Sequence, residues 1–145
     1  MTIRKSTEKD YISIIRSIQN KKIGYITPNL IKKDIEMGRQ YIMIDNFGKI
    51  IAMLSLVYEP NFNYYSMKRL CVPNKKNGGK GYATMMLDYV SHQTTAKVGC
   101  TPWTDNKAMR QILTKLGFTL EYIFDGKWCF YSKKGIDNNC LFWYN

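Results

Sequence analysis

The chain has 145 residues, of which 45% are apolar and 23% are charged, and these proportions suit one globular domain with its own core. The longest nearly uninterrupted apolar run, Ile50 to Tyr58, is too short to cross a bilayer, and the opening segment MTIRKSTEKD lacks a signal-peptide core, so we expect a cytoplasmic protein without a membrane partner. The net charge of +11, with no acidic residue between Glu59 and Asp88, suits a nucleic-acid partner, a polyphosphate cofactor or solubility alone. The basic residues of that interval are Lys68, Arg69, Lys75, Lys76 and Lys80.

The first predicted elements are a short strand over residues 2–5 and a helix directly after it. Thr7 can cap this helix, with Asp10 in the reciprocal position of a capping box. An apolar stripe then recurs at helical spacing and indicates one buried face. Its members are Tyr11, Ile14, Ile15 and Ile18.

A second, shorter helix is predicted to begin at Thr27 and Pro28, because threonine caps a helix and proline suits its first position, and to stop at Gly38. Two stretches rich in Ile, Val, Leu and Tyr follow, at residues 41–46 and 49–57, on either side of the sequence NFGK. This pattern predicts a β-hairpin.

Ser66 to Val72 is predicted to be another strand, and a helix is predicted from Tyr82 to His92. A short strand at residues 97–101 completes the order strand, glycine loop, helix, strand, which is a parallel crossover. The apolar face of this helix is predicted to hold Tyr82, Met86, Tyr89 and Val90.

The stretch KNGGKGYATMMLDYV, from Lys76 to Val90, places three glycines and two lysines before and at the start of this helix. Glycine lets the main chain turn sharply and come close to a ligand, while the start of a helix presents N–H groups and a partial positive charge. The stretch therefore predicts an anion site.

The last predicted helix runs from Asn106 to Leu116, and Gly117 follows it as a terminating residue. Its apolar face comprises Met109, Ile112, Leu113 and Leu116. Strands at 118–124 and 127–132 flank Asp125-Gly126, a two-residue hairpin signal.

The four cysteines are widely spaced and include no Cys-x-x-Cys pair, which argues against a zinc site and does not imply a disulfide framework. We expect reduced structural thiols and no metal. The cysteines are Cys71, Cys100, Cys129 and Cys140.

The order β-α-α-β-β-β-α-β-α-β-β, with the glycine loop between the fourth strand and the third helix, resembles the GNAT acetyltransferase superfamily over residues 2 to 133. The resemblance implies an α/β (α+β) fold, with a mixed, mostly antiparallel sheet of six to seven strands and helices on both faces. It implies a domain over 1–133, followed by a tail or an added strand at 134–145. It also implies acetyl-CoA as co-substrate.

The resemblance assigns cofactor-binding roles to three segments. In the family, the loop after the fourth strand binds the pyrophosphate of acetyl-CoA through backbone N–H groups, and GGKGYA fits that loop. LCVP resembles the family's strand end, whose main chain pairs with the pantetheine arm and polarises the thioester carbonyl. NKAMRQILTKLGF resembles the segment beside the pantetheine and thiol. The residues assigned in this way are Leu70, Cys71, Val72, Gly78, Gly79, Lys80, Gly81, Tyr82, Ala83 and Asn106.

Two positions depart from the family pattern. Gly78 stands where the loop normally has Arg or Gln, so Lys75, Lys76 or Lys80 would supply the positive charge. Leu113 stands where the family often has a Tyr that protonates the departing thiolate. Water or another hydroxyl would then serve as the acid.

Direct attack of an amine on a thioester requires the amine to lose its proton, so a carboxylate near the middle of the sheet is the natural base. Glu59 and Asp105 are the candidates, and a solvated loop or capping role is the alternative for each. Trp103, Pro102 and Tyr64 are candidates for shaping an acceptor pocket, with ordinary packing as their alternative.

The predicted function is transfer of an acetyl group from acetyl-CoA to a primary amine, on a small molecule or a protein. The residues leave the acceptor and a homodimer open. The first alternative is a GNAT-fold protein that binds or modifies nucleic acid through its basic surface. The second is an interaction protein that keeps only the fold.

Overall fold

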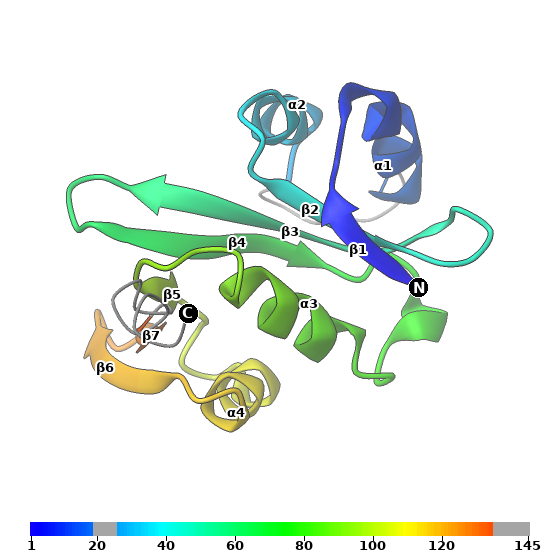
Figure 1. The fold of residues 1–145 in the computed structure, drawn as a ribbon. Coiled ribbons are helices and arrows are strands. Elements are labelled where there is room, and N and C mark those ends of the chain that lie inside the picture. The colour runs from blue at the N-terminus through cyan, green and yellow to red at the C-terminus, as the bar shows by residue number, and fades with distance from the viewer. Residues whose placement is uncertain (19–25, 135–145) are drawn as a thin grey trace, which may run out of the picture. The chain divides into compact units, whose positions relative to one another are not determined.

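Across residues 1–18 and 26–134, which a computed structural model describes, seven strands form one sheet in the order β1-β2-β3-β4-β5-β7-β6 (Figure 1). The strands are β1 (Thr2–Lys5), β2 (Gln40–Ile44), β3 (Ile50–Glu59), β4 (Tyr64–Cys71), β5 (Val98–Cys100), β6 (Thr119–Phe124) and β7 (Trp128–Lys133). The helices are η1 (Glu8–Asp10), α1 (Tyr11–Ile18), α2 (Pro28–Glu36), η2 (Lys75–Asn77), α3 (Tyr82–Ser91) and α4 (Lys107–Lys115).

The sheet is mixed, as predicted. The pairs β1–β2, β2–β3, β5–β7 and β6–β7 are antiparallel, whereas β4 and β5 run parallel and so complete the predicted crossover through α3. The predicted α/β (α+β) fold class is therefore confirmed.

The chain divides into two compact units, which are described separately below. The first unit comprises Met1–Leu56 and Lys68–Val90, and the second comprises Val57–Met67 with the described residues from Ser91 onward. The domain boundary at 1–133 stays a prediction. Residues 135–145, which were expected to form a tail or an added strand, lie outside the described residues.

Both predicted helix starts of the first unit form through local hydrogen bonds. The backbone N–H of Thr7 donates to Asp10 Oδ2 at 2.7 Å, and the backbone N–H of Asp10 donates to the Thr7 carbonyl at 2.9 Å. The Thr27 hydroxyl accepts from the Leu30 N–H at 3.2 Å, and Pro28 occupies the first position of α2.

The core of the first unit lies between α1, α2 and one face of strands β2 to β4. This cluster consists of Ile14, Ile18, Ile26, Ile31, Ile35, Ile42, Ile50, Met53 and Cys71. Tyr41 is the neighbour of Ile42 in β2 and therefore points to the opposite face. There its ring meets Tyr89 of α3 edge-on at 6.2 Å, so helices cover both faces of this part of the sheet (Figure 1).

The predicted face of α3 requires a correction. Met86 and Val90 are fully buried as expected, but Leu87 is also fully buried, whereas Tyr89 is 37% exposed. At 3.6 residues per turn Val90 lies between Met86 and Leu87 on the helix surface, so the buried arc centres near Val90. Tyr89 lies outside this arc, where its ring contacts the ring of Tyr41 and part of the side chain stays exposed.

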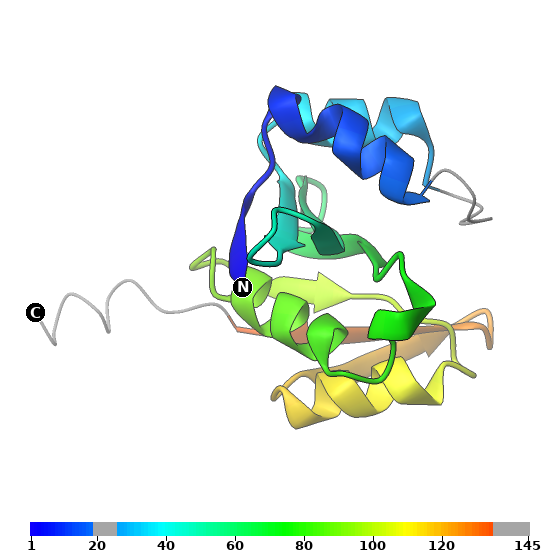
Figure 2. The same ribbon diagram turned by 90° about the vertical axis from the view of Figure 1, so that its right-hand side faces the viewer.

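The second unit is built around the β6–β7 hairpin. Asp125 and Gly126 form its turn with φ of 52° and 62°, the left-handed values that a two-residue type I′ turn requires, so the hairpin prediction is confirmed. Helix α4 packs against the hairpin face that carries Tyr131 and Lys133 (Figure 2). Leu113, in the C-terminal half of α4, is fully buried.

Candidate functional site

The glycine loop lies between β4 and α3, within the first unit. The loop begins with the single turn η2, in which Asn74 Oδ1 accepts from the Lys76 N–H at 3.0 Å. Gly79 and Gly81 then have φ of +74° and +82°, values that side-chain-bearing residues rarely adopt. No other group lies within 4 Å of where a Cβ would stand at either position, so glycine is required here by the main-chain conformation and not by crowding.

Helix α3 starts immediately after the second of these glycines. The Met85 N–H donates to the Gly81 carbonyl at 3.0 Å and closes the first helical turn. The N–H groups of Tyr82, Ala83 and Thr84 precede that bond and therefore have no acceptor within the helix. Together with the partial positive charge of the helix start, they make a concave group of donors that suits a phosphate.

The charge around this loop is positive. Lys75, Lys76 and Lys80 are exposed, and Gly78, the position that the resemblance aligns with an Arg or Gln, has an ordinary extended conformation. The side chains of these lysines can therefore contribute the cationic charge that position 78 lacks. The loop fits an anionic cofactor in its shape, its donors and its charge.

The end of β4 leads into this loop. Cys71 is buried, while Leu70 and Val72 are half-buried. Arg69, directly before them, has φ of +56°, although it is neither a glycine nor part of a turn. A left-handed residue inside a strand turns the backbone out of its regular pleat, so β4 changes direction just before the segment LCVP.

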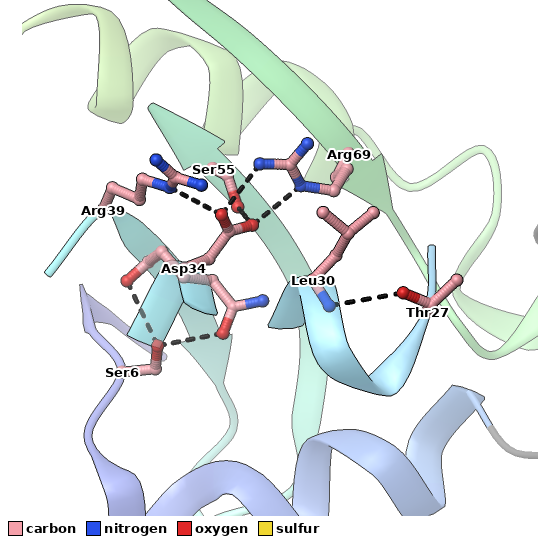
Figure 3. Close-up of polar contacts among 8 residues, drawn as sticks. Ser6, Thr27, Leu30, Asp34, Arg39, Ser55 and Arg69 are labelled. Atoms are coloured by element: carbon pink, nitrogen blue, oxygen red, sulfur yellow. Dashed lines mark hydrogen bonds and ion pairs between the residues drawn. The ribbon is translucent and has the colours of Figure 1, made fainter. Parts of the chain in front are cut away.

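A buried ion cluster holds Arg69 (Figure 3). Its Nε and a terminal nitrogen donate to the two carboxylate oxygens of Asp34 in α2, at 2.7 and 2.8 Å. Arg39 Nε donates to the same carboxylate at 2.6 Å, and so does the Ser55 hydroxyl at 2.6 Å. The Asp34 side chain is fully buried.

The protonation of Asp34 follows from these contacts. Burial alone would raise the pKa of its carboxyl group. The hydrogen bonds from Arg69, Ser55 and Arg39 outweigh that effect, and the pKa of Asp34 lies below its ordinary value. Asp34 is therefore a carboxylate that binds two arginines at neutral pH.

The two predicted base candidates lie on different elements of the second unit. Glu59 ends β3 and is half-buried, and its carbonyl accepts from the Phe62 N–H at 3.2 Å. Burial, followed by the charge of Glu59, raises the pKa of the Tyr64 phenol, so Glu59 acts electrostatically on that ring. Asp105 is exposed in the loop before α4. The catalytic role of either carboxylate stays a prediction.

Asn106 caps α4, because its Oδ1 accepts from the Met109 N–H at 3.2 Å. The side-chain oxygen of Asn106 is therefore used by the helix cap. Its side-chain NH2 group remains as a donor for a cofactor. Leu113 is fully buried in the same helix, so a phenol at that position would lie inside the protein. The local structure thus accounts for Asn106 as a cap, and its cofactor role stays a prediction.

Two features were not found from the sequence. The first is the cluster of Asp34, Arg39 and Arg69, in which Arg69 is 35 positions from Asp34, so no local signal in the sequence pointed to it. The second is the extent of a strip of aromatic rings on the hairpin face opposite α4, where Trp103 and Trp128 stack at 3.8 Å. Of its members, the sequence had indicated only Trp103 and Tyr64, as candidates for shaping an acceptor pocket. This aromatic strip consists of Tyr64, Trp103, Tyr122, Phe124, Trp128 and Phe130. The alternating aromatics around Asp125-Gly126 could have predicted its hairpin part.

The described residues contain no group of three or more His, Cys, Asp or Glu side chains that could hold a metal ion. None of the helices in the described part of the chain has the length and apolar character needed to span a membrane. Cys71, Cys100 and Cys129 form no disulfide with one another.

No protein-family model matches this sequence, and no curated protein matches it significantly. Solved structures do match the fold. A GNAT-family acetyltransferase from Bacillus cereus is 22% identical, covers 92% of this chain and 96% of its own, and superposes with a TM-score of 0.75. Ard1 from Thermoplasma volcanium is 18% identical, with coverage of 91% and 95% and a TM-score of 0.71.

A mutant of spermidine N-acetyltransferase SpeG from Vibrio cholerae is 14% identical, with coverage of 91% and 92% and a TM-score of 0.70. These likenesses extend over nearly the whole length of both chains in each comparison. The chain therefore has the fold of the GNAT acetyltransferases.

Proposed function

We propose that this protein is an acetyl-CoA-dependent N-acetyltransferase, which transfers an acetyl group to a primary amine by direct attack. The observation that carries the proposal is the pair of left-handed glycines, Gly79 and Gly81, at the start of α3 in a GNAT fold. This arrangement would direct main-chain donors toward an anion, and the exposed Lys75, Lys76 and Lys80 would add positive charge. Bound acetyl-CoA would supply an acetyl group activated as a thioester.

The residues that would bind the cofactor lie in two stretches of the first unit. The Gly78 N–H already donates to the Lys75 carbonyl at 3.0 Å. Main-chain N–H groups from Gly79 to Ala83 would therefore bind the pyrophosphate, with Lys75, Lys76 or Lys80 adding positive charge. The main chain of Leu70, Cys71 and Val72 would pair with the pantetheine arm and polarise the thioester carbonyl. The cofactor role of Asn106, in the second unit, stays a separate prediction.

Glu59 is the base that we favour over Asp105. It is half-buried, and its charge acts on Tyr64, whereas Asp105 is exposed. A partly buried carboxylate can attract an ammonium group and accept its proton, directly or through water. The faces of the aromatic strip would favour a cationic acceptor. A dedicated acid at position 113 is not part of the proposal, because Leu113 has no proton to donate.

The test is binding of CoA, which needs no knowledge of the acceptor. We expect micromolar affinity by titration calorimetry and a rise in melting temperature with CoA concentration, since a ligand that binds only the folded state stabilises it by mass action. At a concentration of 100 times Kd the gain is about 2.7 kcal/mol. Absence of heat and of a thermal shift at millimolar CoA would contradict the proposal. A panel of amines, peptides and antibiotics tested for thiol release would then identify the acceptor.

A second candidate function is binding of nucleic acid, and one observation favours it. An open cavity of about 460 Å³ on α4 and β7 has basic side chains and no carboxylate among its lining residues. Those residues are Lys107, Arg110, Gln111, Thr114, Lys115 and Tyr131. If duplex DNA or tRNA is the partner, affinity should fall steeply as salt rises, and replacing Lys107 and Lys115 with Glu should reduce the slope. Binding that is weak at every salt concentration would exclude this candidate.

The proposal includes a cytoplasmic location. It does not decide whether the protein is a monomer or a homodimer. Both can be checked directly. Fractionation of cells reports the location, and light scattering of the purified protein reports the mass of the particle in solution. A mass near 17.0 kDa would correspond to a monomer.

A further inference from the structure

Arg69 has a backbone conformation that its residue type does not favour. Its φ of +56° lies in the left-handed region, where a Cβ crowds the following carbonyl. Among the described residues, the other non-glycine residues with positive φ are Asn63 and Asp125, which are of the types that tolerate it. Arg69 instead lies within β4. Something other than local preference must hold it there.

The ion cluster provides that restraint. The carboxylate of Asp34 accepts two hydrogen bonds from the Arg69 guanidinium, so the Arg69 side chain cannot rotate without breaking both bonds. Arg39 and Ser55 fix the carboxylate in turn, from outside β4. Since Asp34 is fully buried, loss of its partners would leave a charge without solvent, and the cluster resists rearrangement.

We propose that Asp34 is a positioning residue for acetyl transfer: through Arg69 it holds the end of β4 so that the main chain from Leu70 to Val72 faces the thioester arm. This inference rests on the proposed function, because it concerns how that cofactor is received. Arg69 directly precedes the segment in question, so a change in its φ redirects every following peptide group. Asp34 would never touch the cofactor itself.

An ion cluster could also serve stability alone. Two replacements of Arg69 distinguish that role from positioning of the end of β4. Arg69→Ala removes the guanidinium and leaves a Cβ, so the left-handed conformation loses its restraint and remains disfavoured. Arg69→Gly removes the same guanidinium, but glycine adopts that conformation without strain. If only stability is at stake, both variants should bind CoA equally well. If the conformation matters, the glycine variant should bind better.

The control is Arg4→Ala in the same unit, which removes a more exposed two-point contact. Arg4 also binds a carboxylate at two points, donating to Asp10 at 2.8 and 2.9 Å, but it lies in β1 and not beside the cofactor segment. Its loss should lower stability without altering the end of β4.

The experiment measures Kd for CoA by calorimetry, at a temperature where circular dichroism shows every variant to be folded. We expect Kd to rise at least about tenfold in Arg69→Ala, by less than about threefold in Arg69→Gly, and by less than about twofold in Arg4→Ala. In amide NMR spectra, the signals of Leu70, Cys71 and Val72 should move in Arg69→Ala and return toward their original positions in Arg69→Gly. Should Arg69→Ala not fold, Arg69→Lys, which keeps a charge but loses the two-point contact, takes its place.

Equal CoA affinity in the original protein and all three variants would overturn the positioning role and leave the proposed function intact. A loss in Arg4→Ala as large as that in Arg69→Ala would also overturn it, because general destabilisation would then suffice. If the original protein itself binds no CoA, the proposed function fails. In that case, unmoved NMR signals of residues 70–72 in Arg69→Ala would overturn the conformational claim separately.

Discussion

Arg69 and Asp34 are 35 positions apart in the chain, yet they meet through two hydrogen bonds of 2.7 and 2.8 Å inside the first unit. The contact links α2 to the strand that leads into the glycine loop. It joins a fully buried carboxylate to a residue with an unfavourable backbone conformation. Stability and the shape of the candidate site therefore depend on the same side chains.

Replacing Asp34 with Asn should strongly destabilise the protein. The change leaves the buried side of two guanidinium groups without a counter-charge, and breaking a buried ion pair in this way costs about 3 to 5 kcal/mol. Urea unfolding measures the loss. Asp10→Asn is the comparison, because its partner Arg4 is 40% exposed and that pair should contribute only about 1 kcal/mol or less. Equal losses of unfolding free energy in Asp34→Asn and Asp10→Asn would contradict the larger contribution to stability expected of Asp34.

Acid should lower the stability of the protein by protonating Asp10, a carboxylate that is also paired with an arginine. The hydrogen bond from Arg4 is the largest of several contacts that lower the pKa of Asp10 to about 2. A carboxyl whose folded pKa lies below its unfolded value contributes stability that is complete above about pH 4 and is lost as pH falls toward 2. Urea midpoints at pH 5, 4, 3 and 2 should therefore fall, and should fall less in Asp10→Asn. Parallel curves for the two proteins would show that another group is responsible.

Gly81→Val should abolish CoA binding. A valine at φ of +82° is strained, and its side chain would occupy the open space in which we propose that the pyrophosphate binds. Gly48 is a close control, because it lies in the same unit with φ of +80° and equally open surroundings, but in the β2–β3 turn. Gly48→Val should lose similar stability and keep its CoA affinity, as calorimetry would report. Unchanged binding in Gly81→Val would mean that the loop does not hold the cofactor.

Leu113→Tyr should leave the rate of acetyl transfer within about tenfold, a difference of about 1.4 kcal/mol in activation energy. Because Leu113 is fully buried, the larger ring should also lower stability by about 1 to 3 kcal/mol. The measurement is a pH–rate profile of both proteins with the best amine found. A hundredfold rise in rate, with a new basic limb from the phenol, would instead indicate that the chain lacks an acid it needs.

The thiol of Cys100 should react slowly in the folded protein. Burial raises its pKa to about 12, so almost no thiolate is present at pH 8. An aromatic disulfide reagent should therefore modify Cys100 far faster in guanidinium than in buffer, in a variant with Cys140 replaced by Ser. Cys71 and Cys129 are buried and should also react slowly. Reaction of Cys100 in buffer at the rate of free cysteine would contradict the expectation.

The local signals of the sequence were sufficient for most of the fold. The cap at Thr27 and Pro28 and the turn at Asp125 and Gly126 form from residues within four positions of one another, so their residue types report their structure directly. The glycine loop belongs to the same class. Its left-handed conformations at Gly79 and Gly81 are what glycine allows, and its place before a helix predicts an anion site.

Only the tertiary structure determined those features that depend on residues distant in the sequence. Leu87 could not be assigned to the buried face of α3 from spacing alone, because the sheet that covers the helix sets where the buried arc is centred. Arg69 carried no sign of its left-handed conformation, since its own preference opposes it. That conformation exists because a carboxylate 35 residues away, fixed by Arg39 and Ser55, holds the guanidinium more strongly than the backbone resists. Such a balance arises only when the folded chain brings the groups together out of water, where ion pairs are strong and unpaired charges are costly.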